Sequence, residues 1–138
     1  MNGTHSQAEK KREKKKKNSQ YMNVVSSKQT DRDDNGYIYH RGELFTGIEE
    51  WHYDTGELGT TTEYVSGIPN GFERGWYKNG AKRSEKQYVA GSVQGIVRKW
   101  HENGQLQLEK EVKNGKQMWI KQWDETGRLI VDSKSTSI

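Results

Sequence analysis

The fold of this chain is decided by the stretch from Tyr88 to Glu109, which reads YVAGSVQGIVRKWHENGQLQLE. Its opening has counterparts before and after it, in Tyr64-Val-Ser-Gly67 and Val112-Lys-Asn-Gly115. A second set of glycines closes each unit: Gly56, Gly80, Gly104 and Gly127, which lie 24, 24 and 23 residues apart. A fixed period of this length predicts a stack of equivalent small units, each packing on its neighbours.

Each unit is predicted to be two short strands joined by tight turns. The dipeptides Asn79-Gly80, Asn103-Gly104 and Asn114-Gly115 favour the type I′ hairpin turn, because both of its central residues need a positive φ. Thr55-Gly56, Ala90-Gly91 and Thr126-Gly127 are interpreted as variants of that turn. The sequence therefore predicts an all-β fold, a single-layer antiparallel β-meander of stacked hairpin repeats of about 24 residues.

Strand register follows if Asn103-Gly104 is a two-residue loop. Arg98 then faces Glu109, and Trp100 faces Gln107. The same count predicts three further charged pairs: Arg74 with Glu85, Lys121 with Asp132, and Glu73 with Lys86. In the first unit it places Glu50 opposite Thr61 instead. A cross-strand ion pair contributes only ~0.2–1 kcal/mol, so these pairs specify register more than stability.

Alternation along the strands divides the apolar side chains between two faces. One face is predicted to carry Trp76, Trp100, Trp119 and Trp123 with Phe72, Ile96 and Ile130. The other is predicted to carry Tyr53, Tyr64, Tyr77, Tyr88, Leu58, Leu106, Leu108 and Val112. These aromatic side chains either pack along their own sheet or form an exposed binding surface. The candidate partner-binding residues are Tyr53, Trp76, Tyr77, Trp100, His101, Trp119 and Trp123.

The chain divides into a basic tail and a repeat region. Residues 1–20 have no apolar face and are predicted to be a flexible tail, residues 21–34 a linker or edge strand, and residues 35–138 the repeats. Residues 1–30 hold 8 Lys/Arg against 2 Asp/Glu, a net +6, whereas the rest holds 15 against 17, a net −2. The candidate anion-binding residues are Lys10, Lys11, Arg12, Lys14, Lys15, Lys16 and Lys17. Such a run either binds phosphates of lipid or nucleic acid, or serves only solubility.

Composition excludes several classes of protein. The chain has no cysteine, so disulfides, thiolate catalysis and cysteine metal sites are absent. We find no apolar run long enough to cross a membrane, and none follows the basic run as a secretion signal requires. Residue 2 is Asn rather than the Gly of a myristoylation motif. We therefore expect a cytoplasmic protein.

Metal binding and catalysis find little support in the sequence. Residues 31–38 match the opening of an EF-hand loop, with Gly36 at position six and Ile38 at position eight, but position twelve is Gly42 and the acidic Glu43 comes one residue late. A turn before a strand at Tyr37–Tyr39 is favoured instead. Glu85 and Glu109 are each predicted to face an arginine, which keeps a carboxylate ionised and unsuited to act as a general acid. We expect no metal, no cofactor and no enzymatic activity.

The stretch Tyr88–Glu109 resembles a MORN-variant repeat, and Tyr39–Gly47 resembles a first unit of the same kind. The resemblance extends over residues 35–131 and is to the group labelled YwqK-family antitoxins. It implies a sheet of stacked hairpins that binds a partner protein stoichiometrically, with a toxin as the partner. The alternative is a peripheral anchor, in which the Lys-rich tail binds anionic membrane or nucleic acid. The chain departs from the pattern at Met118 and Trp119, which replace the second glycine of the fourth unit.

Overall fold

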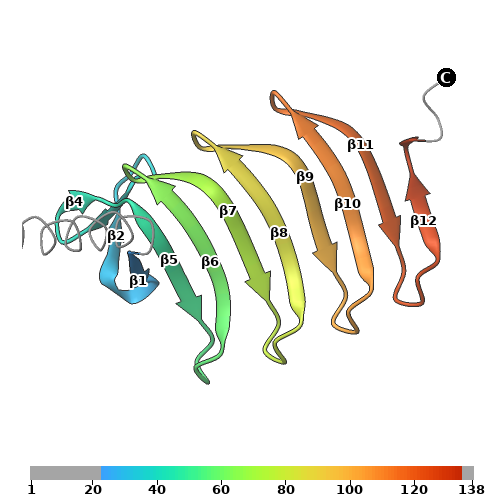
Figure 1. Cartoon of the computed structure of the whole chain (residues 1–138), viewed down its shortest axis with the longest axis horizontal. Coiled ribbons are helices and arrows are strands. Elements are labelled where there is room, and N and C mark those ends of the chain that lie inside the picture. The colour runs from blue at the N-terminus through green and yellow to red at the C-terminus, as the bar shows by residue number, and fades with distance from the viewer. Residues whose placement is uncertain (1–22, 135–138) are drawn as a thin grey trace, which may run out of the picture.

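The computed structural model describes residues 23–134, so the predicted basic tail lies outside the described residues. Eight strands follow one another as an antiparallel meander (Figure 1). They are β5 (Gly47–His52), β6 (Leu58–Val65), β7 (Ile68–Trp76), β8 (Lys82–Val89), β9 (Ser92–Trp100), β10 (Leu106–Lys113), β11 (Lys116–Trp123) and β12 (Leu129–Asp132). The predicted all-β meander of hairpin repeats is confirmed.

The N-terminal part adds features that the repeat pattern does not predict. β1 (Val24–Ser26) joins the edge of the large sheet by pairing in parallel with β5. After the short 3-10 helix η1 (Ser27–Gln29), a second sheet forms from β2 (Thr30–Arg32), β3 (Ile38–His40) and β4 (Glu43–Leu44). The strand expected at Tyr37–Tyr39 is therefore present, shifted by one residue.

One inserted residue accounts for the separate hairpin of β3 and β4. Gly42 and Gly47 are five residues apart, whereas the corresponding Gly67 and Gly71 are four apart. In the second unit a single strand, β7, runs through this position; in the first, the extra residue separates β4 from β5. The break allows Phe45 to turn inward, where it is 2% exposed.

The apolar core lies at this end of the molecule. Val25, Ile38, Phe45 and Tyr64 form one buried cluster, and the rings of Phe45 and Tyr64 lie 6.2 Å apart between centroids. Among the described residues of β7 to β12, Val97 is the only buried hydrophobic side chain. The C-terminal two-thirds of the sheet is therefore a single layer whose side chains are mostly half-buried.

Two kinds of turn alternate along the sheet. At the edge drawn uppermost in Figure 1, both central residues have positive φ, as the type I′ turn requires. These turns are Ser66-Gly67, Ala90-Gly91 and Asn114-Gly115, and Arg41-Gly42 between β3 and β4 is of the same kind. The prediction is confirmed for the two of them that it named, Ala90-Gly91 and Asn114-Gly115.

The opposite edge has longer loops, so the type I′ prediction is wrong there. In the loop after β7, Tyr77 N–H donates to the Ala81 carbonyl (2.9 Å) and Gly80 N–H donates to the Tyr77 carbonyl (2.9 Å). Gly80 alone has positive φ, whereas Asn79 does not. Its side chain instead accepts a bond from Ala81 N–H at 2.9 Å. The same backbone bonds close the loops at Tyr53–Glu57, His101–Gln105 and Asp124–Arg128.

The predicted register nevertheless holds in the middle of the strands. Arg98 pairs with Glu109 as predicted, because an extra residue after the loop restores the count. That residue is Gln107, which forms a β-bulge between the pairs Leu106–Trp100 and Leu108–Lys99. The remaining predicted pairs are also in register: Arg74–Glu85, Glu73–Lys86, Lys121–Asp132 and Glu50–Thr61.

Next to the loops the predicted register is wrong. Trp100 pairs with Leu106 rather than Gln107, and His52 pairs with Leu58. Cross-strand partners point to the same side of a sheet, so Leu106 shares the face of Trp100 and not that of the tyrosines. Ile130 is the extra residue of the last bulge, which shifts the pairing between β11 and β12.

Candidate functional site

Four of the predicted binding residues meet on one face of the sheet. Side chains two residues apart along a strand lie on the same side, and so do direct cross-strand partners. This places the four tryptophans of β7, β9 and β11 together with their partners on β8, β10 and β12. We call this surface the ladder face; it comprises Phe72, Arg74, Trp76, Lys82, Glu85, Gln87, Ile96, Arg98, Trp100, Leu106, Glu109, Glu111, Trp119, Lys121, Trp123, Leu129 and Asp132.

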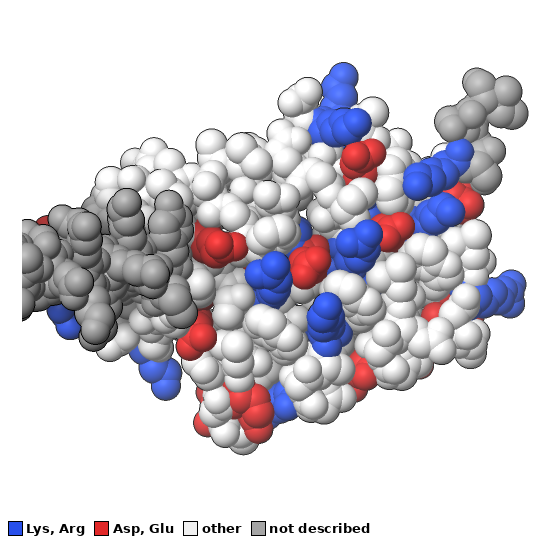
Figure 2. All heavy atoms as spheres, in the orientation of Figure 1, with Lys and Arg blue, Asp and Glu red and all other residues white. Residues whose placement is uncertain are grey.

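A row of charges crosses the middle of the ladder face. Its members are Arg74, Glu85, Arg98, Glu109, Lys121 and Asp132, one from each strand, and their sign alternates (Figure 2). Three ion pairs join them in turn, at nitrogen–oxygen distances of 3.2, 2.8 and 3.9 Å. We call these six residues the charge row.

The charge row is neither buried nor fully solvated. Its arginine side chains are 41–43% exposed, and the carboxylates 22–29%. Between hairpins the row continues in register, because Glu85 pairs with Arg98 and Glu109 with Lys121. The six charges thus form a neutral array with one side open to solvent. Further desolvation of such an array costs less than burial of an isolated charge.

Apolar side chains lie on both sides of the charge row. Toward the long loops, β7, β9 and β11 each end in a tryptophan, and the next strand supplies its partner. We call this set the tryptophan row: Trp76, Lys82, Trp100, Leu106, Trp123 and Leu129. Lys82 Nζ lies 5.6 Å from the ring centroid of Trp100, a cation–π contact. Alternation alone did not identify Lys82, Leu106 and Leu129 as members of the tryptophan row, because the β-bulges next to the loops change the face of the sheet on which they lie.

On the other side of the charge row lie Phe72, Ile96 and Trp119, with Gln87 and Glu111 on the strands between them. The Arg74 guanidinium covers the Phe72 ring at 4.3 Å from its centroid. Trp119 donates its indole N–H to Glu111 (3.1 Å), and Lys134 Nζ lies 3.7 Å from its ring centroid. Phe72 remains 36% exposed. The ladder face is therefore a row of paired charges between two partly exposed rows that contain aromatic side chains.

The other three predicted binding residues have a different position and role. Tyr53 donates its hydroxyl to the Trp76 carbonyl (2.8 Å), and Tyr77 does the same to the Trp100 carbonyl (2.6 Å). His101 Nε2 lies 2.9 Å from the Trp123 carbonyl. Each of these side chains thus joins its own unit to the next one. Their polar ends stabilise the stack and are not available to a partner.

Asp124 occupies the same position in the last described loop and binds within that loop. Its carboxylate accepts bonds from the Thr126 hydroxyl (2.6 Å) and from the backbone N–H groups of Thr126 (2.9 Å) and Arg128 (3.0 Å). The Thr126 hydroxyl is the largest cause of a pKa for Asp124 below its ordinary value, and the N–H of Arg128 adds to it. An ionised Asp124 therefore stabilises the loop.

A second set of bonds between units lies at the edge with the tight turns. Asn70 Oδ1 accepts from Ala90 N–H at 2.9 Å, and Gln94 Oε1 accepts from Asn114 N–H at 3.3 Å. Thr46 Oγ1 accepts from Ser66 N–H at 2.9 Å. The acceptor always precedes the donor by 20 residues. Sequence reasoning missed these residues; the signal was a polar side chain directly before Gly47, Gly71 and Gly95.

The opposite face is partly covered. Near the N-terminus Glu49 accepts a bond from Thr30 (2.6 Å) and pairs with Arg32 (3.5 Å), and Tyr64 is 5% exposed. Desolvation is the main reason that the pKa of Tyr64 lies above its ordinary value. Further along, Lys86 pairs with Glu73 at 3.2 Å. The three-stranded sheet therefore packs against this face and leaves the ladder face clear of it.

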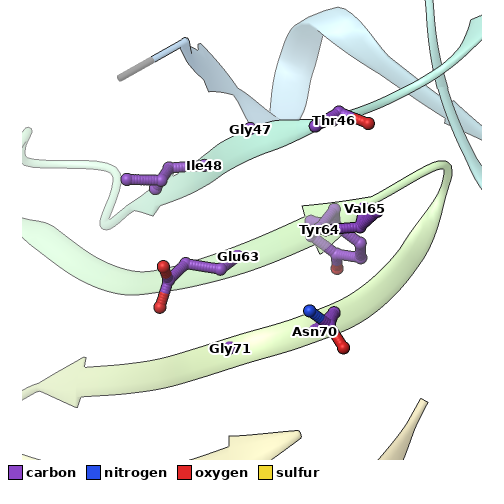
Figure 3. Close-up of a pocket in the computed structure, with 8 residues that line it drawn as sticks. All are labelled: Thr46, Gly47, Ile48, Glu63, Tyr64, Val65, Asn70 and Gly71. Atoms are coloured by element: carbon purple, nitrogen blue, oxygen red, sulfur yellow. The ribbon is translucent and has the colours of Figure 1, made fainter. Parts of the chain in front are cut away.

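A hollow of about 390 Å³ lies between β5, β6 and β7 (Figure 3). Its floor is open because Gly71 has no side chain, and Glu63 extends across it. The Glu63 carboxylate already accepts a bond from the backbone N–H of Phe72. The acidic group of the hollow is therefore already bonded to the backbone of β7, at the register shift between β6 and β7.

The segment that resembles an EF-hand opening forms a turn. Asp33 Oδ1 accepts from the N–H groups of Asn35 (3.0 Å) and Tyr37 (2.9 Å), and Oδ2 accepts from the Tyr39 hydroxyl (3.0 Å). Although desolvation opposes its ionisation, these bonds hold the pKa of Asp33 below its ordinary value. Between residues 23 and 134, no group of three or more His, Asp or Glu side chains is arranged to hold a metal ion.

No protein-family model, curated protein or solved structure matches this chain. Over residues 23–134, no helix is long and apolar enough to cross a bilayer.

Proposed function

We propose that this chain is a non-enzymatic protein-binding module that binds its partner stoichiometrically through the ladder face. The observation that carries the proposal is the placement of four tryptophans on one side of the sheet around a row of alternating charges. Tryptophan and arginine are the residues most enriched at binding hot spots. The resemblance to YwqK-family antitoxins implies that the partner is a toxic protein, which the module neutralises by binding and masking it.

The charge row supports specificity in this proposal. A row that alternates in sign at each strand, about 4.8 Å apart, favours only a partner with matching opposite charges. A partner displaced by one strand meets like charges, which costs several kcal/mol at an interface. The flanking tryptophans supply contact area, and the charges select the partner and its register.

The experiment is a purification of the chain from its native cells, followed by measurement of the molar ratio of the proteins in the complex. We expect Trp100→Ala to weaken partner binding by at least ~10-fold, as hot-spot truncations do. The matched control is Trp51→Ala, since Trp51 is 45% exposed and lies on the opposite face, in an edge-to-face contact with Tyr53 at 4.8 Å between ring centroids. Equal losses from both variants, or binding that neither changes, would contradict the proposal.

The net charge of +6 on residues 1–30 favours a second candidate function, a peripheral anchor that binds anionic membrane or nucleic acid. It predicts binding to vesicles containing phosphatidylserine that weakens sharply between low and high salt. Deletion of residues 1–20 would abolish this binding and leave capture of a protein partner intact. Vesicle binding that survives the deletion would exclude the tail as the anchor.

A further inference from the structure

We propose that the ladder face binds a second copy of this chain, so that two sheets stack face to face about a two-fold axis between β9 and β10. This inference rests on the proposed function, in which the ladder face binds protein, and names one partner of that face. The axis runs parallel to the strands. It therefore reverses the order of the strands and keeps each row of side chains opposite the same row of the second copy.

The charge row is complementary to itself under this operation. It has six members of alternating sign, so reversal of their order places every charge opposite its counter-charge. Arg74 faces Asp132 of the second copy, Glu85 faces Lys121, and Arg98 faces Glu109, and each contact occurs twice. A row with an odd number of alternating charges would instead place like charges together. An isologous dimer requires this kind of self-complementary surface.

The tryptophan row is complementary in size under the same axis. Trp76 stands opposite Leu129 of the second copy, and Trp100 opposite Leu106. Trp123 stands opposite Lys82, which already makes a cation–π contact with Trp100 in its own chain. No two tryptophans are opposed, so each indole meets a smaller or longer, flexible side chain. This arrangement of large against small is typical of packed layers.

The area of the face suits a stable dimer. Six strands at about 4.8 Å spacing and eight residues of about 3.3 Å each cover roughly 700 Å² per copy. A standard protein–protein interface buries about 800 Å² per partner. Because the six members of the charge row are already paired at 2.8–3.9 Å within each chain, dimerisation buries this row as a neutral network and not as separate ions.

The thinness of the sheet supplies the driving force. Among the described residues, β7 to β12 hold one buried hydrophobic side chain, Val97, while Phe72 and Leu129 are 36% and 44% exposed. A sheet is normally stable when at least one face packs against a second layer. The second copy provides this layer, and aligned packing of two twisted sheets at about −30° accommodates their twist.

The test is sedimentation equilibrium on the full chain and on two charge-reversed variants. The acidic variant carries Arg98→Glu and Lys121→Glu, and the basic variant carries Glu85→Lys and Glu109→Lys. We expect the unmodified chain to be a dimer at about 100 µM, since interfaces of this area bind in the micromolar range or tighter. Each variant alone places like charges together at four contacts, which weakens its self-association by on the order of 100-fold or more.

The decisive measurement is the equimolar mixture of the two variants. All six contacts then join opposite charges, so a one-to-one heterodimer forms although neither variant dimerises alone. The control carries Lys99→Glu and Lys110→Glu, two reversals on the opposite face of β9 and β10, and remains a dimer. An unmodified chain that stays monomeric, or a mixture that stays monomeric while both variants retain a β-sheet circular dichroism spectrum, overturns the inference.

The outcomes separate this inference from the proposed function. If the chain is monomeric but Trp100→Ala still weakens its binding to a different protein, the dimer is rejected and the proposed function stands. A dimer that the charge-reversed variants do not disrupt rejects this interface. If the dimer forms as proposed, any other partner of the ladder face must compete with the second copy. Addition of that partner then converts the dimer to a one-to-one complex.

Discussion

A single hydroxyl group on Tyr77 joins two units of the sheet. It donates to the Trp100 carbonyl at 2.6 Å, next to the tryptophan row. We expect Tyr77→Phe to keep the ring in place and lower the free energy of unfolding by ~1 kcal/mol, the usual net value of such a bond. Urea unfolding measures the change. The control is Tyr37→Phe, because Tyr37 is 37% exposed. An equal loss of unfolding free energy in the control would argue against a special role for Tyr77.

Asp124 makes stability depend on pH in the acid range. Its pKa in the folded chain lies below the ordinary value of 3.8, so the ionised form stabilises the fold fully above that value. This contribution is lost as the pH falls through the lower, folded-state pKa. We expect Asp124→Asn to lower the Tm at pH 6 and to have progressively less effect below about pH 4. A difference in Tm that stays constant from pH 6 to pH 2.5 would contradict the assignment.

At the scale of the hairpin, the sequence predicts strand pairing better than turn geometry. Opposite charges at one position in three units identify the register, because only one alignment brings Arg98 to Glu109 and Arg74 to Glu85. Asn-Gly dipeptides fit both a type I′ turn and a five-residue loop with glycine in its fourth position. The compensating bulge at Gln107 leaves no separate signal in the sequence, so Leu106 was assigned to the wrong face.

Ala90 shows how the tight turns constrain side chains. It sits at φ 49°, a conformation that costs a residue with a Cβ about 1–2 kcal/mol. We expect Ala90→Gly to raise the free energy of unfolding by ~0.5–1 kcal/mol, because relief of this strain exceeds the greater entropy of glycine in the unfolded chain. The matched control is Ala81→Gly, at negative φ at the other edge, which should destabilise by a similar amount. Chemical denaturation of both variants tests the opposite signs.

At the scale of the whole molecule, stability is unevenly distributed. The cluster of Val25, Ile38, Phe45 and Tyr64 holds β1, β3 and β6 together, whereas β12 pairs only with β11 in the large sheet. In a stack of repeats, units with fewer neighbours open first. We expect backbone amides of β6 to exchange with deuterium at least ~10-fold more slowly than those of β12, at concentrations where the chain is monomeric. Uniform protection along the sheet would contradict this.

The candidate site was partly predictable for a physical reason. Trp76, Trp100 and Trp123 lie two residues beyond Arg74, Arg98 and Lys121 on unbroken strands, so alternation alone places them together. Tyr77 and His101 fall within loops, where alternation ends and backbone bonds decide the side-chain direction. The hairpin of β3 and β4 depends on one inserted residue whose effect is visible only when tertiary contacts with Phe45 are known.

The alternation of sign along the charge row has a consequence for how such a chain can change its length in evolution. Each of the three units from β7 to β12 contains two strands, with one cation and one anion of the charge row. Excision or duplication of a whole unit, from one tight turn to the next, rejoins equivalent backbone positions and leaves the polarity of the pattern unbroken. Loss of a single strand would place two charges of the same sign side by side and shift the alternation of sign in all the strands that follow. Genes for chains of this kind should therefore vary in length by whole modules, with an even number of charged strands retained.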